Sequence, residues 1–183
     1  MKHVSNQSLS KDKAKPIFLV GFMGSGKTYW GKMLAAANNF SFIDLDEAIE
    51  KKTGRTVAEI FENIGEEYFR MIETKKLRSL VKKRNTIIAC GGGTPCFYEN
   101  MQWMNDHGKT IYLSSTPEDI LKRVLSEMEK RPLIKNLNQA ELYFFIQQKL
   151  REREPFYNQS KFIVQSNEAS IHSFASIISN VNL

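Results

Sequence analysis

The residues with the clearest chemistry form the stretch "GFMGSGKT", from Gly21 to Thr28. Gly21, four further residues and then Gly26, Lys27 and Thr28 match the G-x-x-x-x-G-K-[ST] pattern of a phosphate-binding loop, with the apolar stretch before it and the helical pattern after it that this loop requires. Its glycines let the backbone turn N–H groups towards phosphate oxygens. Lys27 should reach the β- and γ-phosphates, and Thr28 should ligate Mg²⁺. We therefore predict that the loop binds a nucleoside triphosphate rather than forming a turn without a ligand.

Two acids follow the next apolar stretch, in "FIDLD". Asp44 and Asp46 are two residues apart, and in an extended segment their side chains would share a side and could both face the loop. One carboxylate could support the metal shell, and the other could accept a proton from an attacking hydroxyl. The alternative is that both acids cap the helix that begins here. The nearby phosphate loop favours a functional role.

Three arginines and a run of glycines are further candidates. Arg70 lies among glutamates on a helix, a pattern that by itself indicates a surface ion pair. Arg153 precedes Pro155 and could simply offset the dipole at a helix C-terminus. Arg131 lies in an irregular segment, where a lid arginine could meet the γ-phosphate. The glycines of "CGGG" follow a strand and would let a ligand approach the backbone closely.

Apolar strand patterns alternate with helical patterns along the chain. The predicted strands are 17–20, 40–43, 86–90, 110–113 and 161–164. This alternation predicts a three-layer α/β/α domain of the P-loop NTPase type, with a five-stranded parallel sheet. Ligands should gather beyond the carboxyl ends of the strands, where the motifs lie. We expect a flexible leader at 1–15 and a single domain at 16–183, with a mobile lid at about 126–140.

Local patterns also predict details of the helices. Four apolar residues recur at helical spacing and should face the core: Trp30, Met33, Leu34 and Ala37. Thr56 and Glu59 form a capping box, and Ser115 with Glu118 should form a second one. Pro155 should end the helix that follows the lid.

Composition limits the function classes. The chain has 183 residues and a net charge of +6, but no nucleic-acid-binding module and no apolar run of the roughly 20 residues that a membrane span needs. Cys90 and Cys96 fit neither a zinc site nor a paired-thiol motif. We expect a cytoplasmic monomer that binds neither nucleic acid nor membranes.

Together these motifs resemble the shikimate kinase family, within the wider group of small-molecule and nucleoside monophosphate kinases. The resemblance runs from about Ile17 to Val164 through six ordered segments: "GFMGSGKT", "FIDLD", "TGRTVAEIFENIGEEYFR", "CGGG", "RPLI" and "REREPFY". It implies transfer of the ATP γ-phosphate to the 3-hydroxyl of shikimate, a step towards chorismate and the aromatic amino acids.

The resemblance also implies roles for individual residues. Those implied to bind ATP are Gly24, Ser25, Gly26, Lys27, Thr28, Tyr29 and Arg131. Those implied to bind shikimate are Asp46, Arg70, Arg153 and the backbone at Gly92. Thr28 and Asp44 would hold Mg²⁺. The implied catalytic residues are Lys27, Asp46 as the candidate base, and Arg131 on the lid.

The chain departs from the family pattern at Tyr29, where a smaller residue is usual, and at Thr94 to Cys96, where small apolar residues are usual. Arg123 is a plausible residue to stack on adenine. A related kinase acting on gluconate or a nucleoside monophosphate is the nearest alternative, but two carboxylate-gripping arginines favour a small acid as acceptor. A nucleotide-dependent binding protein without turnover is the other alternative, and Asp46 and Arg131 argue against it.

Overall fold

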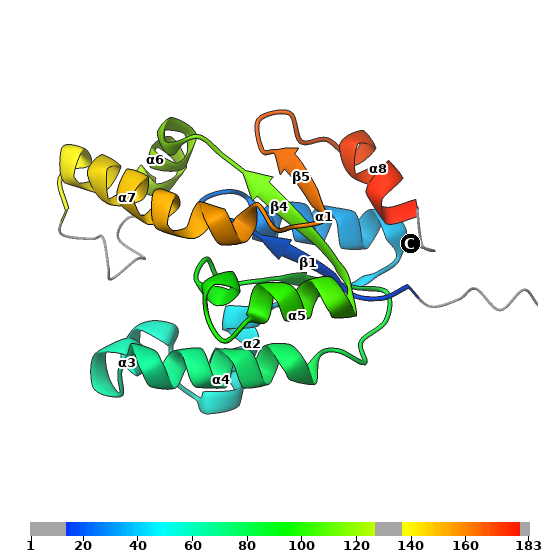
Figure 1. Ribbon diagram of the computed structural model, residues 1–183, viewed down its shortest axis with the longest axis horizontal. Helices are drawn as coiled ribbons and strands as arrows, with labels where there is room; N and C mark the ends of the chain where they lie inside the picture. Colours follow the sequence, from blue (N-terminus) through cyan, green and yellow to red (C-terminus); the bar gives the residue numbers. More distant parts are fainter. Residues whose placement is uncertain (1–13, 127–136, 180–183) are drawn as a thin grey trace, which may run out of the picture.

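The computed structural model describes residues 14–126 and 137–179 of the chain. Five strands pair in parallel in the order β2-β3-β1-β4-β5 (Figure 1). Their bounds are β1 Ile17–Val20, β2 Ser41–Asp44, β3 Thr86–Ala89, β4 Lys109–Ser114 and β5 Phe162–Gln165. The predicted five-stranded parallel sheet is confirmed, and each strand lies within two residues of its predicted bounds.

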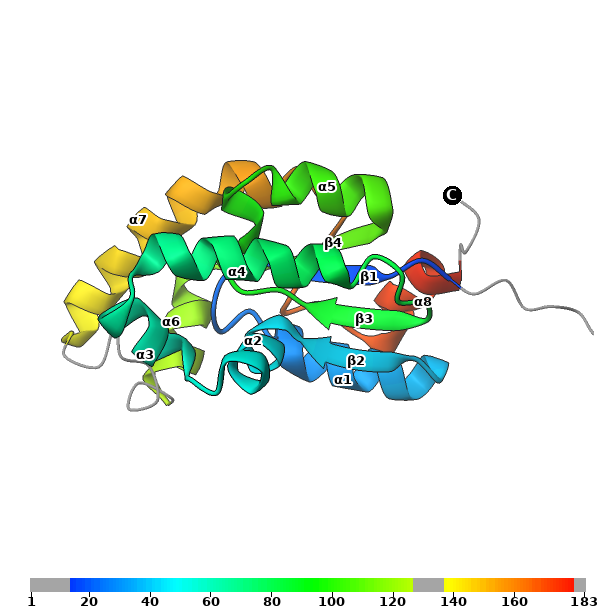
Figure 2. The same ribbon diagram turned by 90° about the horizontal axis from the view of Figure 1, so that it is seen from below.

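Helices cover both faces of the sheet, so the predicted three layers are confirmed (Figures 1 and 2). The helices are α1 Lys27–Asn38, α2 Leu45–Thr53, α3 Val57–Asn63, α4 Glu66–Ser79, α5 Asn100–His107, α6 Pro117–Leu125, α7 Gln139–Tyr157 and α8 Ile171–Ser179, with a short 3₁₀ turn, η1, at Thr94–Cys96. Helices α1 and α8 pack on one face, and α2 to α7 pack on the other. None of the described helices is both long and apolar enough to cross a membrane.

The central strand β1 shows how the sequence divides the core between the two faces. Ile17 and Leu19 join the cluster under α1 and α8, whereas Phe18 and Val20 join the larger cluster on the opposite face. Successive side chains of a strand point to opposite sides, so a strand buried on both faces must be apolar throughout. The four apolar residues of β1 meet this demand.

The buried face of α1 agrees with the predicted one at Trp30 and Leu34, which pack in the core, but differs at Met33 and Ala37. Gly31, Leu34 and Ala35 are buried, whereas Met33 is 40% exposed and Ala37 is also exposed. The helix is turned so that Gly31 lies against β2, where an added Cβ would come within 2.3 Å of the Phe42 ring. Hydrophobic spacing missed Gly31 on this face because glycine carries no apolar side chain that a pattern can register.

Helix α6 begins one residue later than predicted. The Thr116 hydroxyl accepts a hydrogen bond from the Asp119 N–H at 3.2 Å, and Ser115 instead contacts Ser166 at 2.6 Å between hydroxyl oxygens. The predicted Ser115 capping box is therefore wrong. Pro117 takes the first helical position, which proline favours, and this makes Thr116 the cap. The other predicted capping box, at the start of α3, is confirmed.

Helix α7 does not end at Pro155, as predicted, but continues to Tyr157. Proline lacks a backbone N–H and so deprives the Arg151 carbonyl of its helical partner. The helix continues across this defect with Leu150 before it and Tyr157 after it, both buried in the core. Arg153 therefore lies inside a helix, about one turn before its end. The predicted lid lies mostly outside the described residues.

Candidate active site

The phosphate loop connects β1 to α1 and takes its shape from three glycines. Gly21, Gly24 and Gly26 have φ angles of 141°, 75° and 93°, a region that side chains other than glycine rarely adopt. Lys27 lies back over the loop, and its Nζ donates to the carbonyls of Gly21 and Phe22 at 2.7 and 2.8 Å. Its ammonium thus lies over the loop whose N–H groups are predicted to meet the phosphates.

The loop is braced from α6. The Arg123 Nη1 donates to the Gly24 carbonyl at 3.1 Å and to Ser166 Oγ at 3.2 Å. Two other residues predicted to bind ATP differ in exposure. Ser25 is buried with its hydroxyl enclosed, whereas Tyr29 is 62% exposed beside the ring of Trp30. The Ser25 side chain therefore lies inside the loop, while the Tyr29 ring stands in solvent.

Asp44 connects the loop to the second strand. Its Oδ2 accepts a hydrogen bond from Thr28 Oγ1 at 3.0 Å, and its Oδ1 accepts from the backbone N–H groups of Asp46 and Glu47 at 3.1 and 3.4 Å. Asp44 is thus the N-cap of α2. Asp46 lies in the first turn of that helix, whereas the sequence analysis had placed it in an extended segment. The capping interpretation holds for Asp44, whose other oxygen still faces the phosphate loop.

Asp46 is a partly buried carboxylate among other charges. Its Oδ1 is enclosed and accepts no hydrogen bond from the described residues. Burial, with the nearby charges of Glu73 and Asp44, raises the pKa of Asp46 to about 7, although Lys27 and Arg70 counteract part of the rise. A carboxyl group with this pKa can both accept and release a proton near neutral pH.

The three glycines after β3 bring the predicted acceptor residues together. A Cβ on Gly91 would lie 3.0 Å from Asp46 Oδ1, and one on Gly92 would lie 3.3 Å from Arg153 Nη1. A Cβ on Gly93 would come within 2.5 Å of Arg70 Nη2. Side chains thus lie within 3.0 Å of where a Cβ on Gly91 or Gly93 would be, whereas Gly92 leaves more room. Close approach of a ligand to the backbone at these glycines stays a prediction.

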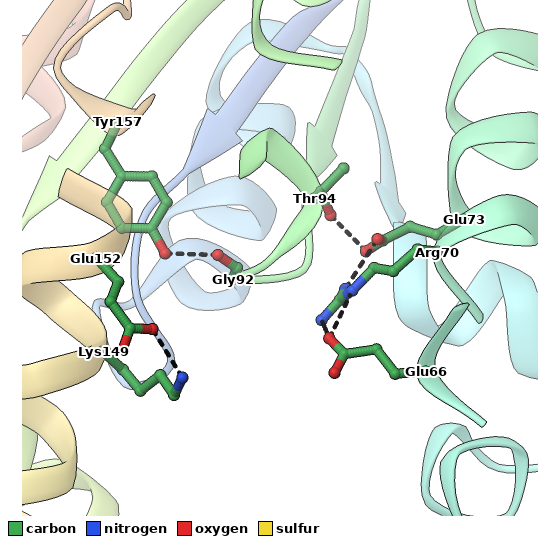
Figure 3. Close-up of polar contacts among 8 residues, drawn as sticks. All are labelled: Glu66, Arg70, Glu73, Gly92, Thr94, Lys149, Glu152 and Tyr157. Carbon is green, nitrogen blue, oxygen red and sulfur yellow. Dashed lines mark hydrogen bonds and ion pairs between the residues drawn. The ribbon is translucent and has the colours of Figure 1, made fainter. Parts of the chain in front are cut away.

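Arg70 is buried, so its interpretation as a surface ion pair is wrong. Its side chain donates to Glu66 Oε1 from Nε and Nη2 at 3.1 and 3.0 Å, and to Glu73 Oε2 from Nη1 at 2.9 Å. The guanidinium carbon lies 4.6 to 5.5 Å from three phenylalanine ring centres: Phe97, Phe69 and Phe61. These contacts fix the Arg70 guanidinium on the α4 side of the glycines (Figure 3).

Arg153 approaches the glycines from the opposite side, on α7. Its guanidinium carbon lies 5.5 Å from the centre of the Phe22 ring, next to the phosphate loop. One turn later on α7, the Tyr157 hydroxyl donates to the Gly92 carbonyl at 2.5 Å (Figure 3). Arg153 precedes the last turn of α7, which carries no basic residue, so the helix-dipole interpretation of Arg153 is wrong.

Glu73 is a residue of this site that sequence reasoning missed. It is completely buried, and its Oε1 accepts a hydrogen bond from Thr94 Oγ1 at 2.5 Å. Burial raises the pKa of Glu73, and Arg70 and Thr94 counteract part of this rise. Its position could have revealed it, since Glu73 lies midway between Phe69 and Leu77 on the buried face of α4. An acid at an apolar position of a helix is a sign of a buried polar contact.

Comparison with known proteins agrees with this geometry. The shikimate kinase family model matches residues 23–182. A shikimate kinase from Bacteroides thetaiotaomicron is 42% identical over 152 residues, which are 83% of this chain and 87% of that protein. One from Azobacteroides pseudotrichonymphae is 45% identical over 148 residues, or 80% of this chain and 87% of that protein. The chain belongs to the shikimate kinase family.

Solved structures of the family share the fold. The crystal structure of shikimate kinase from Bacteroides thetaiotaomicron superposes with a TM-score of 0.84 at 39% identity, covering 90% of this chain and 96% of that one. Shikimate kinase from Acinetobacter baumannii, solved in complex with shikimate, has a TM-score of 0.80 at 32% identity and covers 91% of each chain. The chain is therefore an ATP-dependent phosphotransferase with shikimate kinase activity, as the motifs predicted, and not a binding protein without turnover.

Proposed function

We propose that the kinase holds the ATP phosphates on the loop from Gly21 to Thr28 and holds shikimate between Asp46, Arg70 and Arg153. The observation that carries this proposal is the run of glycines after β3, which lies against all three acceptor residues. A Cβ on Gly92 would also lie 3.6 Å from backbone atoms of the phosphate loop. The two binding regions thus share a wall, as direct transfer between bound reactants requires.

In the proposed transfer one proton moves, one bond forms and one bond breaks. Asp46 accepts the proton of the shikimate 3-hydroxyl as that oxygen bonds to the γ-phosphorus, and the bond from the γ-phosphorus to the bridging oxygen breaks to release ADP. Lys27 offsets the negative charge of the phosphates. Arg70 and Arg153 bind the shikimate carboxylate, for which guanidinium groups are well suited. The shikimate complex of the Acinetobacter protein supports a pocket of this kind in the family.

The residues proposed for Mg²⁺ fit that ion. Thr28 Oγ1 and an Asp44 oxygen lie 3.0 Å apart at the start of α1. Within the described part of the chain, no cluster of three or more His, Cys, Asp and Glu residues could hold a metal by itself. Mg²⁺ is commonly held by one or two protein oxygens together with substrate phosphates and water. When bound, it neutralises charge on the β- and γ-phosphates.

Release of ADP tests the acceptor. With Mg-ATP, we expect turnover with shikimate and little with gluconate or AMP. Turnover on gluconate or AMP without turnover on shikimate would refute the assignment.

A second test addresses the base. Asp46→Asn should lower kcat by about 10²- to 10⁴-fold, the range for removing a general base, while ATP binding is retained. Glu47→Gln is the matched control, because Glu47 is the exposed neighbour of Asp46 on α2. Equal kcat values for Asp46→Asn and Glu47→Gln would remove the catalytic role of Asp46.

Other assignments stay predictions from the sequence. Arg131 lies outside the described residues, so its contact with the transferred phosphate is untested. The same holds for the Tyr29 contact with ATP, the monomeric state and the cytoplasmic location.

A further inference from the structure

A chain of buried polar contacts runs behind the proposed acceptor pocket. Both oxygens of the Glu73 carboxylate are hydrogen-bonded, Oε2 by Arg70 Nη1 at 2.9 Å and Oε1 by Thr94 Oγ1 at 2.5 Å (Figure 3). Glu73 and Thr94 are both completely buried. This chain joins α4 to η1, which follows the glycines directly.

The contacts of Arg70 leave one end of its guanidinium for a ligand. A guanidinium carries five N–H groups, and Glu66 and Glu73 accept hydrogen bonds from three of them. Among the described residues, two N–H groups therefore have no hydrogen-bond acceptor, one on Nη1 and one on Nη2. Such a pair can bind both oxygens of a carboxylate, which requires the guanidinium to be held in one orientation.

We propose that Thr94 is a positioning residue for substrate binding: its hydroxyl fixes the Glu73 carboxylate, which in turn holds the Arg70 guanidinium in the orientation that binds the shikimate carboxylate. This inference rests on the proposed role of Arg70. Thr94 itself touches neither substrate nor ATP in this scheme and acts through Glu73.

The surroundings of Glu73 explain why loss of the Thr94 hydroxyl would change the orientation of the Arg70 guanidinium. A Cβ on Gly91 would lie 2.8 Å from Glu73 Oε1 and 3.0 Å from Asp46 Oδ1, so the two carboxylates face one small space. Without the Thr94 donor, Glu73 Oε1 would be a buried acceptor beside another acid, which is unfavourable. Glu73 could then rotate towards Arg70 or take up a proton. Either change alters the contact that orients the guanidinium.

The backbone of Thr94 holds its hydroxyl in place. Its N–H donates to the Gly91 carbonyl at 3.1 Å, and its carbonyl accepts from Asn100 Nδ2, also at 3.1 Å. Asn100 Nδ2 donates as well to the hydroxyl of Thr74, the residue after Glu73 on α4, at 2.9 Å. Thr74 thus supplies a matched control, since its buried hydroxyl lies in the same network but is bonded to Asn100 and not to the Glu73 carboxylate.

Steady-state kinetics of three variants test the proposal. Thr94→Val removes the hydroxyl with little change of shape and should raise KM for shikimate about tenfold or more, with kcat and KM for ATP within about twofold. Thr94→Ser keeps the donor and should retain the wild-type KM. Thr74→Val should leave KM for shikimate unchanged, even where it lowers the melting temperature as much as Thr94→Val. If Thr94→Val does not fold, Thr94→Ala takes its place in the comparison.

Two results would overturn the proposal: an unchanged KM for shikimate in Thr94→Val, or an equal rise in Thr94→Val and Thr74→Val. Arg70→Lys separates this failure from failure of the proposed function, because lysine keeps the charge but loses the paired N–H groups. A raised KM in Arg70→Lys with an unchanged one in Thr94→Val would refute the role of Thr94 alone. An unchanged KM in Arg70→Lys would refute the proposed role of Arg70 and this inference with it.

Discussion

At the scale of a single residue, ionisation of Asp46 lowers the free energy of unfolding. Its pKa is raised from 3.8 to about 7, so between these values the folded state binds more protons than the unfolded state. The free energy of unfolding therefore falls as the pH rises through this window and levels off above it. Ionisation of Asp46, which its proposed role as the base requires, thus works against stability.

Asp46→Asn should accordingly stabilise the protein at high pH. Above about pH 7 we expect a gain of about 2 kcal/mol, less than the full shift implies because the side chain is partly open to solvent. Well below pH 3.8 the gain should vanish, since Asp46 is then protonated in both states. Urea unfolding across this range measures the effect, with Glu47→Gln as the exposed control. A gain that does not change with pH would contradict the assigned burial of Asp46.

Arg70 and Arg153 should respond differently to truncation. Arg70→Ala leaves Glu73 buried without its charge partner, and loss of one partner of a buried pair costs about 3–5 kcal/mol. Arg153 is less buried and lies over Phe22, so Arg153→Ala should cost only about 1 kcal/mol while raising KM for shikimate. Chemical denaturation of both variants, with KM measured for Arg153→Ala, tests this. Equal stabilities would contradict the buried pairing of Arg70.

At the scale of elements, the contact between α1 and β2 depends on Gly31. Gly31→Ala should gain about 1 kcal/mol in helix propensity, but its Cβ would lie 2.3 Å from the Phe42 ring. Overpacking of this kind typically costs about 1–3 kcal/mol, and so close a contact places the cost at the upper end. We therefore expect a net loss of stability in thermal unfolding.

Met33→Ala is the companion variant on the same helix. Because Met33 is exposed, its truncation should change stability by less than about 0.5 kcal/mol. Had Met33 faced the core, as its spacing suggested, the loss would be about 2–5 kcal/mol. A large loss in Met33→Ala would therefore contradict the orientation of α1.

At the scale of the whole molecule, the phosphate loop and Asp44 should link folding to nucleotide binding. A non-hydrolysable ATP analogue at about 100 times its Kd adds about 2.7 kcal/mol to stability, which for a chain of this size raises Tm by about 5–10 °C. The rise should shrink when EDTA removes Mg²⁺ and should be largely lost in Lys27→Ala. The Asp46→Asn variant should show the same rise in Tm as the wild type. A rise that EDTA leaves unchanged would argue against a metal held at Thr28 and Asp44.

The sequence by itself determined the order of the elements, the phosphate loop and the family. These features depend on local patterns: apolar strands such as 17–20, glycines at fixed spacing in the loop, and the Thr56–Glu59 capping box at the start of α3. A local pattern can be read without knowing which distant segments meet, because backbone sterics and side-chain periodicity act within a few residues. The sequence also named Asp46, Arg70 and Arg153, through resemblance to the family.

Only the tertiary structure decided what these residues touch. It placed Glu73 and Thr94 behind Arg70, brought side chains against Gly91 and Gly93, and carried α7 past Pro155. Burial of a charge, the available side of a guanidinium and the closeness of two carboxylates all depend on segments that are distant in the chain. Packing between such segments sets these energies, and no local spacing encodes it.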